Sequence, residues 1–130
     1  MSIKSDSIWY SGLSTGIFEI DIQHSNIDQL ILILERARGE STIKESMDIL
    51  LHAIENHFKY EEVKFGSNSE KMNQKHKDEH RRILREYSDI AHKFQVPDAI
   101  DIAKELVGMM KVVLMNHVKD FDCKFFQDAS

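Results

Sequence analysis

NSEKMNQKHKDEHRRILREYSDIAHKF (residues 68–94) is a strongly polar stretch in which a thin stripe of side chains recurs at helical spacing. Ser67, followed three residues later by Glu70, has the spacing of a capping box, which predicts that a helix begins here. Two histidines, His76 and His80, interrupt the stripe one turn apart, about 40° from each other around the axis. An unpartnered buried imidazole costs about 1–3 kcal/mol, so an inward pair needs partners. An isolated pair of histidines at this spacing more often lies on a solvent-exposed helix face and bonds to water. The stripe consists of Met72, His76, His80, Ile83, Leu84, Tyr87 and Ala91.

Three further helices are predicted on either side of this one. Residues 20–38 carry apolar side chains at three-and-four spacing, as do residues 42–65, which end before Gly66. Pro97 suits the first turn of a last helix that runs to about residue 120. Five glycines and one proline provide few turns. The sequence therefore predicts an all-α protein, an up-down-up-down four-helix bundle.

The N-terminal residues 1–18 differ in composition from the rest of the chain. They place Trp9 and Tyr10 among serines and glycines without a helical period, so we expect an extended N-terminal arm. No internal repeat or long linker divides the remainder of the chain. Residues 1–130 are therefore predicted to form a single domain.

The charge balance argues against several functions. Lys and Arg number 17 and Asp and Glu 22, so the formal net charge is −5 at pH 7. Nucleic acids and anionic membranes both require clustered positive charge, so neither is an expected partner. No run of 18 apolar residues and no apolar signal segment is present, and Cys123 is the single cysteine. We expect a cytoplasmic protein. The charged run from Lys75 to Arg85 is expected to be a solvated face.

Histidines and carboxylates also recur on the other predicted helices. His57 and Glu61 are four residues apart, beside the inward Phe58. By itself such a pair is more often a surface hydrogen bond than a pair of metal ligands. His24 lies three residues before Ile27 on the first predicted helix.

The last predicted helix offers a pair with an unusual spacing. His117 and Asp122 are five residues apart, which leaves them about 140° apart on a regular helix. They can face one point only if the helix ends or widens between them, for instance through a π-type turn. All three spacings together are expected about 0.1 times by chance, so the joint pattern indicates one shared buried site. His52 and His92 lie outside these motifs and are expected to face solvent.

The residue types of the predicted donors limit which metal ions can bind. Five imidazoles and two carboxylates are too many for one tetrahedral zinc ion, and they suit two six-coordinate ions bridged by the carboxylates. Ligands rich in nitrogen and free of thiolate favour iron, copper, zinc or nickel over magnesium or calcium. Carboxylate-rich di-iron bundles use Glu-x-x-His pairs, which these residues do not form. A histidine-rich, less anionic site is better suited to binding a diatomic molecule.

The chain resembles the hemerythrin family, and within it the single-domain bacteriohemerythrins. The resemblance extends from the arm to the tail, in family order and with family-like gaps. It is carried by Trp9, Gly16-Ile17, Ile20-Asp21-Ile22-Gln23-His24, His57-Phe58-Lys59-Tyr60-Glu61-Glu62, His76 through His80, and Asn116-His117 through Asp122.

The resemblance implies a non-haem di-iron centre built from these residues. One iron would be held by three histidines and the other by two, and two carboxylates together with an oxo or hydroxo group would bridge them. The implied sets are His76, His80 and His117 for the first iron, His24 and His57 for the second, and Glu61 and Asp122 for the bridges.

The resemblance further implies that dioxygen binds at an open position of the two-histidine iron. Ile27, Phe58 and Leu114 stand at positions that resemble the lining of the family's pocket. The chain departs from the family pattern in two places. A Tyr-Pro common before the HxxxH element is replaced by Gly66-Ser67-Asn68, and Val113 stands where invertebrate relatives have a tryptophan. The smaller side chain would admit water and speed oxidation of the iron.

Reversible binding of dioxygen, for carriage, storage or delivery and without catalysis, is the expected function. Dioxygen is the predicted partner, and the sequence identifies no protein partner. One alternative is a module that senses oxygen, nitric oxide or iron. Another is a peroxidase-like or nitric-oxide-reducing di-iron enzyme, which the wider access beside Val113 favours.

Overall fold

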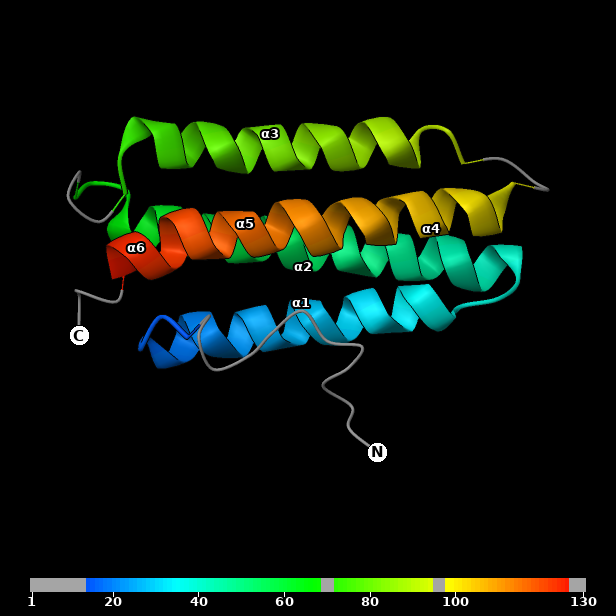
Figure 1. The fold of residues 1–130 in the computed structure, drawn as a ribbon, viewed down its shortest axis with the longest axis horizontal. Helices are drawn as coiled ribbons and strands as arrows, with labels where there is room; N and C mark the ends of the chain where they lie inside the picture. Colours follow the sequence, from blue (N-terminus) through cyan, green and yellow to red (C-terminus); the bar gives the residue numbers. More distant parts are fainter. Residues whose placement is uncertain (1–13, 69–71, 95–97, 127–130) are drawn as a thin grey trace.

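The computed structural model describes residues 14–68, 72–94 and 98–126, which form four helical rods (Figure 1). The first three rods are α1 (Phe18–Arg36), α2 (Glu40–Phe65) and α3 (Gln74–Ala91), and the fourth starts with α4 (Ala99–Met109). α2 contacts both α1 and α3, and α4 contacts all three. Successive rods run in opposite directions, and the described residues contain no strand. The predicted all-α, up-down-up-down bundle is confirmed. No described helix is both long and apolar enough to cross a membrane.

The fourth rod is a continuous helix that widens twice. α4 passes into a π-helix, η3 (Met110–Leu114), and a single α turn, α5 (Met115–His117), comes next. A second π-helix, η4 (Val118–Asp122), then leads into α6 (Cys123–Phe126). Of the two possibilities predicted between His117 and Asp122, an end of the helix or a widening, the structure has the widening. The described part of the rod extends six residues beyond the predicted residue 120.

The first rod begins two residues earlier than predicted. The carboxylate of Asp21 accepts hydrogen bonds from the backbone N–H and the hydroxyl of Thr15, each at 2.8 Å. Ser14 Oγ donates to the same carboxylate at 2.8 Å and the Gly16 N–H at 3.2 Å. These bonds hold residues 14–16 against the first turn of α1, so the helix starts at Phe18. Trp9 and Tyr10 lie outside the described residues.

The third rod begins later than predicted, at Gln74. Asn73 precedes it in an extended conformation, and its side-chain Oδ1 accepts the backbone N–H of His76 at 2.9 Å. This cap, and not the predicted capping box, accepts a hydrogen bond from a free backbone N–H group in the first turn of α3. Glu70 of that box lies outside the described residues, as does Pro97. α2 ends before Gly66, as predicted.

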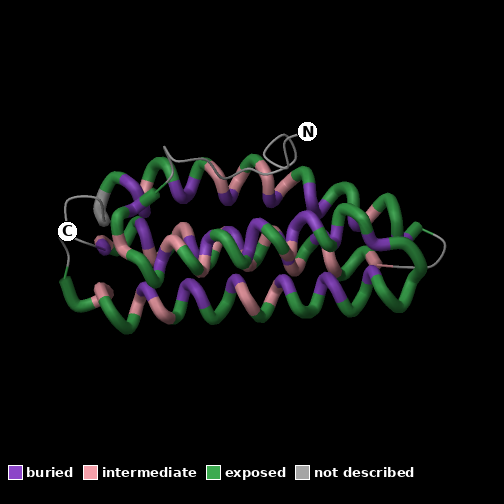
Figure 2. The backbone as a smooth tube through the Cα atoms, turned by 90° about the horizontal axis from the view of Figure 1, so that it is seen from below, coloured by how far each residue is buried: buried purple, intermediate pink, exposed green. Residues whose placement is uncertain are grey.

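Buried positions face inward along every rod (Figure 2). One apolar cluster fills most of the bundle with side chains such as Ile31, Leu50, Ile83 and Leu106, each fully buried. Burying each such side chain stabilises the fold by about 1.5–3 kcal/mol. At the end formed by the start of α3 and by η4, histidines and carboxylates are buried alongside smaller apolar clusters such as Ile20 with Met72.

The hydroxyl of Tyr87 joins α3 to α2 inside the bundle, where it donates to the carbonyl oxygen of Met47 at 2.5 Å. Replacing Tyr87 with Phe removes this bond without changing the packed volume. We expect Tyr87→Phe to lower the free energy of unfolding by about 1 kcal/mol in urea titrations. The half-buried Tyr60 provides the control, because Tyr60→Phe should shift the midpoint less. Equal midpoints for Y87F and the parent protein would show that the bond contributes nothing.

Candidate metal centre

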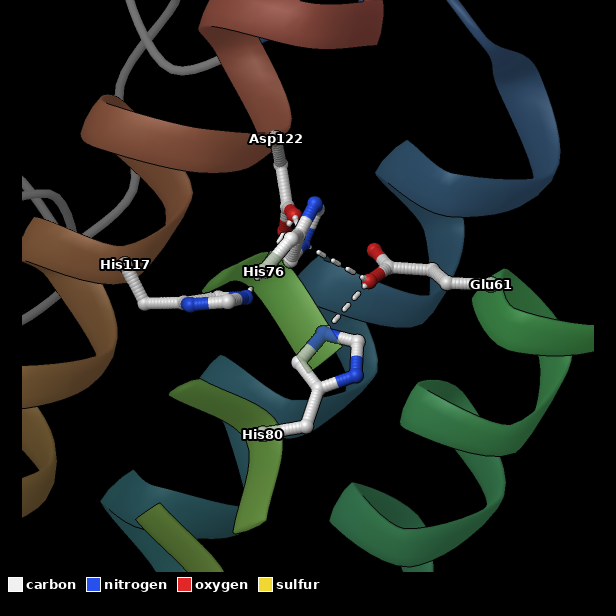
Figure 3. Close-up of side chains that lie close together, drawn as sticks. All are labelled: Glu61, His76, His80, His117 and Asp122. Carbon is white, nitrogen blue, oxygen red and sulfur yellow. Dashed lines mark hydrogen bonds and ion pairs between the residues drawn. The ribbon is translucent and has the colours of Figure 1, made fainter. Parts of the chain in front are cut away.

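The four rods bring all seven residues of the predicted donor set into one buried cluster. Each of these side chains is 3% exposed or less. They are His24 from α1, His57 and Glu61 from α2, His76 and His80 from α3, and His117 and Asp122 from the fourth rod. Figure 3 shows five of them converging from three rods. The cluster therefore exists as a geometric unit.

Glu61 lies between two sets of imidazoles and turns one oxygen toward each set. Its Oε1 lies 3.0 Å from Nε2 of His80 and 3.7 Å from Nε2 of His76. Its Oε2 lies 3.0 Å from Nε2 of His57 and 4.0 Å from Nε2 of His24. This is the arrangement of a carboxylate that bridges two positions.

Asp122 divides its oxygens in the same way. Oδ1 lies 3.0 Å from Nε2 of His76 and 3.4 Å from Nε2 of His117, and Oδ2 lies 3.0 Å from Nε2 of His24. The donor atoms consequently form two groups, in each of which all lie within 4.8 Å of one another. One group has three histidines, the other has two, and both contain Glu61 and Asp122.

Local structure fixes the directions of these side chains. The widened turn η4 places Asp122 on the same side of the rod as His117, because a π-helix pairs residues five apart. The cap at Asn73 holds the backbone of His76 itself. Phe58 stacks on His80, with ring centroids 3.9 Å apart and planes at 6°, which sets the plane of that imidazole.

Hydrogen bonds from outside the cluster set the protonation of two imidazoles. Nδ1–H of His57 donates to Oε1 of Gln23 at 2.6 Å, and Nδ1–H of His80 donates to Oε2 of Glu62 at 2.8 Å. Each bond leaves the Nε2 lone pair directed at the cluster, as in most metal-ligating histidines. The sequence did not assign these roles to Gln23 and Glu62. Each is adjacent in sequence to a cluster residue but bonds to a histidine on another rod.

Several donor atoms of the cluster have no hydrogen-bond partner. They are Nε2 of His57, His80 and His117 and both oxygens of Glu61, all fully buried. His57 and His80 approach Glu61 to 3.0 Å, but without hydrogen-bond geometry. Buried polar atoms are almost always paired, so lone pairs that converge in this way are suited to a shared cation. Nitrogen and oxygen donors without thiolate fit iron or another first-row transition metal.

The electrostatics favour the same conclusion. Burial and the neighbouring carboxylate of Asp122 raise the pKa of Glu61. The pKa of Asp122 is well below its usual range despite burial, because His117, His24 and His76 face it. Burial lowers the pKa of His57 to about 4 and also lowers the pKa of His80. Both rings are thus neutral at physiological pH, the form that binds metals.

The three residues predicted to line a dioxygen pocket are buried beside or near the cluster. Ile27, Phe58 and Leu114 are at most 2% exposed and belong to the main apolar cluster. Phe58 contacts the rings of His57, His80 and His117, and Ile27 lines a surface hollow of about 200 Å³ together with His57. Val113 is half-buried and packs against the edge of the core.

The two histidines outside the motifs face solvent, as predicted. His52 and His92 are exposed. Each donates Nδ1–H to the carbonyl oxygen four residues earlier, Asp48 at 2.8 Å and Ser88 at 2.6 Å.

Fold and cluster together define a four-helix-bundle protein with buried histidine and carboxylate donors for a metal. No protein-family model matches the chain, and no solved structure matches it. Curated proteins named Bacteriohemerythrin do match, from Pseudomonas paraeruginosa (strain DSM 24068 / PA7) and Pseudomonas aeruginosa (strain LESB58). Each is 28% identical over 121 residues, which cover 91% of this chain and 78% of the relative. The chain is a hemerythrin-like protein.

Removing one donor should release metal. We expect His80→Ala and Glu61→Ala each to lose at least one of two bound ions per chain and to unfold at a lower temperature, because binding energy here is also folding energy. Metal analysis and thermal unfolding after loading with ferrous iron measure both effects. His92→Ala, at the C-cap of α3, and His52→Ala on α2 are the matched controls and should keep the parent's metal content. Unchanged metal content in H80A and E61A would refute the site.

The lowered pKa of His57 should affect the stability of the metal-free protein. The ring takes up a proton near pH 6.5 when unfolded but only near pH 4 when folded. Acid therefore favours the unfolded chain. Because the unfolded chain binds this proton more tightly, the free energy of unfolding should fall by about 3 kcal/mol as the pH falls from about 6.5 to about 4. His57→Gln should abolish this part of the pH dependence in urea titrations of chelator-treated protein. Parallel pH profiles for H57Q and the parent would contradict it.

Proposed function

We propose that the chain binds two iron ions in this cluster and reversibly binds dioxygen at one of them. The observation that carries the proposal is the unequal division of donors around two shared carboxylates. Three histidines with Glu61 and Asp122 offer five donors to one ion, and two histidines with the same carboxylates offer four to the other. The ion held by His24 and His57 thus has the more open position. The similarity to proteins named Bacteriohemerythrin supports iron as the metal.

The surroundings of this open position favour binding over catalysis. A pair of ferrous ions supplies the two electrons that reversible dioxygen binding draws on. Phe58, Ile27 and Leu114 are buried and apolar, so they exclude water and have no proton to donate to a bound molecule. Gln23, which accepts the hydrogen bond of His57, is an amide and stays neutral. The chain's own part is to hold the donors, keep the pocket dry and leave one position open.

Protein loaded anaerobically with two ferrous ions should develop a visible charge-transfer band when dioxygen is admitted. The band should disappear when dioxygen is removed, and it should reappear over several cycles. His57→Ala should abolish the band because it removes a donor of the more open ion, whereas His52→Ala on the same rod should leave it unchanged.

Three results would count against carriage. A protein with two ions and no dioxygen-dependent band would refute dioxygen binding. Peroxide or nitric oxide turnover well above that of free iron would favour the enzyme. A change in oligomeric state between the oxidised and reduced forms would favour the sensor.

A further inference from the structure

A hollow with a basic rim lies on the surface beside the cluster, between the first turns of α3 and the last turns of the fourth rod. Its volume is about 740 Å³, and it is lined by Lys75, Glu79, Lys119, Asp120, Phe121 and Lys124 together with Asn73. The proposed function assigns no role to these side chains. We call it the lysine hollow.

The lysine hollow is positively charged within an acidic chain. Lys75, Lys119 and Lys124 are all exposed, and they come from two rods. Of the two carboxylates in the lining, Glu79 is engaged by the guanidinium of Arg82, which donates from Nε at 3.0 Å and also from a terminal nitrogen. The lining therefore carries three lysines and two carboxylates, one of which is paired with an arginine. A chain with a net charge of −5 repels acidic proteins in general, so a local positive patch selects where one can dock.

Phe121 connects the lysine hollow to the cluster. Its half-buried ring lies in the wall of the hollow. The centroid of this ring is 5.1 Å from that of His76 and 5.3 Å from that of His117, with the His117 plane tilted by only 21°. A molecule seated in the hollow is thus separated from two of the seven donors by one aromatic ring. Electron transfer between proteins depends on such short separations, because tunnelling decays steeply with distance.

We propose that the lysine hollow is the docking site of a small acidic one-electron carrier of the ferredoxin class, which reduces the iron centre through Phe121. The inference rests on the proposed function, since dioxygen binding requires both ions in the ferrous state. Two reduced carriers each give up one electron and leave oxidised, and two ferric ions become ferrous. No proton or chemical group passes through the hollow. The buried donors are at most 3% exposed, so a protein carrier cannot reach the metals directly.

The test uses the iron-loaded, oxidised protein and reduced plant-type [2Fe–2S] ferredoxin, a low-potential carrier. Anaerobic stopped-flow spectroscopy measures the second-order rate of reduction at low and high salt. Ferredoxin should reduce the triple variant Lys75→Gln, Lys119→Gln, Lys124→Gln about tenfold more slowly at low salt than it reduces the parent protein. The rate for this variant should also lose most of its salt dependence. The matched control neutralises three exposed lysines, Lys44, Lys93 and Lys104. They belong to the start of α2, the residues just after α3 and the start of α4, and these segments lie at the end of the bundle opposite α6 (Figure 1). This variant should be reduced at the parent's rate.

Two further measurements separate docking from electron transfer. Calorimetric titration with oxidised ferredoxin should show binding that the hollow variant weakens about tenfold and the control variant does not. Phe121→Leu should keep this affinity but slow reduction, because the ring is lost and the lysines remain. Dithionite, a small anionic reductant, should reduce the parent and both triple variants at equal rates at high salt, where its attraction to the lysines is screened.

The proposal is overturned if both triple variants slow equally, or if reduction of the parent protein does not depend on salt. Its failure is distinguishable from failure of the proposed function. If the protein binds and releases dioxygen over several cycles but the lysine substitutions do not change its rate of reduction by ferredoxin, the docking site alone is refuted. A protein with no dioxygen-dependent band refutes the proposed function.

Discussion

The arrangement of the polar end of the bundle depends on two fully buried carboxylates, Glu61 and Asp122. Burial penalises their charge, and each raises the cost of ionising the other, so the pair needs compensating positive charge. The fold surrounds them with five imidazoles, of which His57 and His80 are held neutral by burial. These two neutral rings supply lone pairs but no charge, whereas, despite burial, Asp122 raises the pKa of His117. A pair of cations would satisfy the carboxylates and the imidazoles together, so we expect metal binding and folding to be coupled at this end of the molecule.

The opposite end of the bundle offsets the energetic cost of this arrangement. There the rods meet through one apolar cluster that includes Ile31, Leu50 and Leu106, and its packing is the main contribution that holds them in register. The polar end can then carry buried lone pairs without hydrogen bonds, and it contains η4, the second of the two widened turns of the fourth rod. The π-helix weakens the local hydrogen-bond ladder. In return it brings Asp122 to the side of His117, which a regular helix would not do.

Periodicity was sufficient to predict the four rods. The angle between His117 and Asp122 was sufficient to predict that the last helix ends or widens between them, but not which of the two occurs. The convergence of the seven donors was predicted from their joint spacing, although their role as metal ligands stays a prediction. The predicted start of α3 was wrong because Ser67 and Asn73 can both cap a helix, and the cap that forms is Asn73, whose side chain accepts the backbone N–H of His76. Gln23 and Glu62 were missed because each bonds to a histidine on another rod.

The partners of the two imidazoles also make the cluster asymmetric. His80 donates to the carboxylate of Glu62, whereas His57 donates to the neutral amide of Gln23. A carboxylate partner makes an imidazole the stronger electron donor, so it stabilises the more highly charged state of the ion that the imidazole holds. The lysine hollow approaches the same three-histidine group, through Phe121 to His76 and His117. Under the two proposals, electrons would arrive on one side of Glu61 and Asp122 and dioxygen would bind on the other, so a docked carrier would not obstruct the pocket.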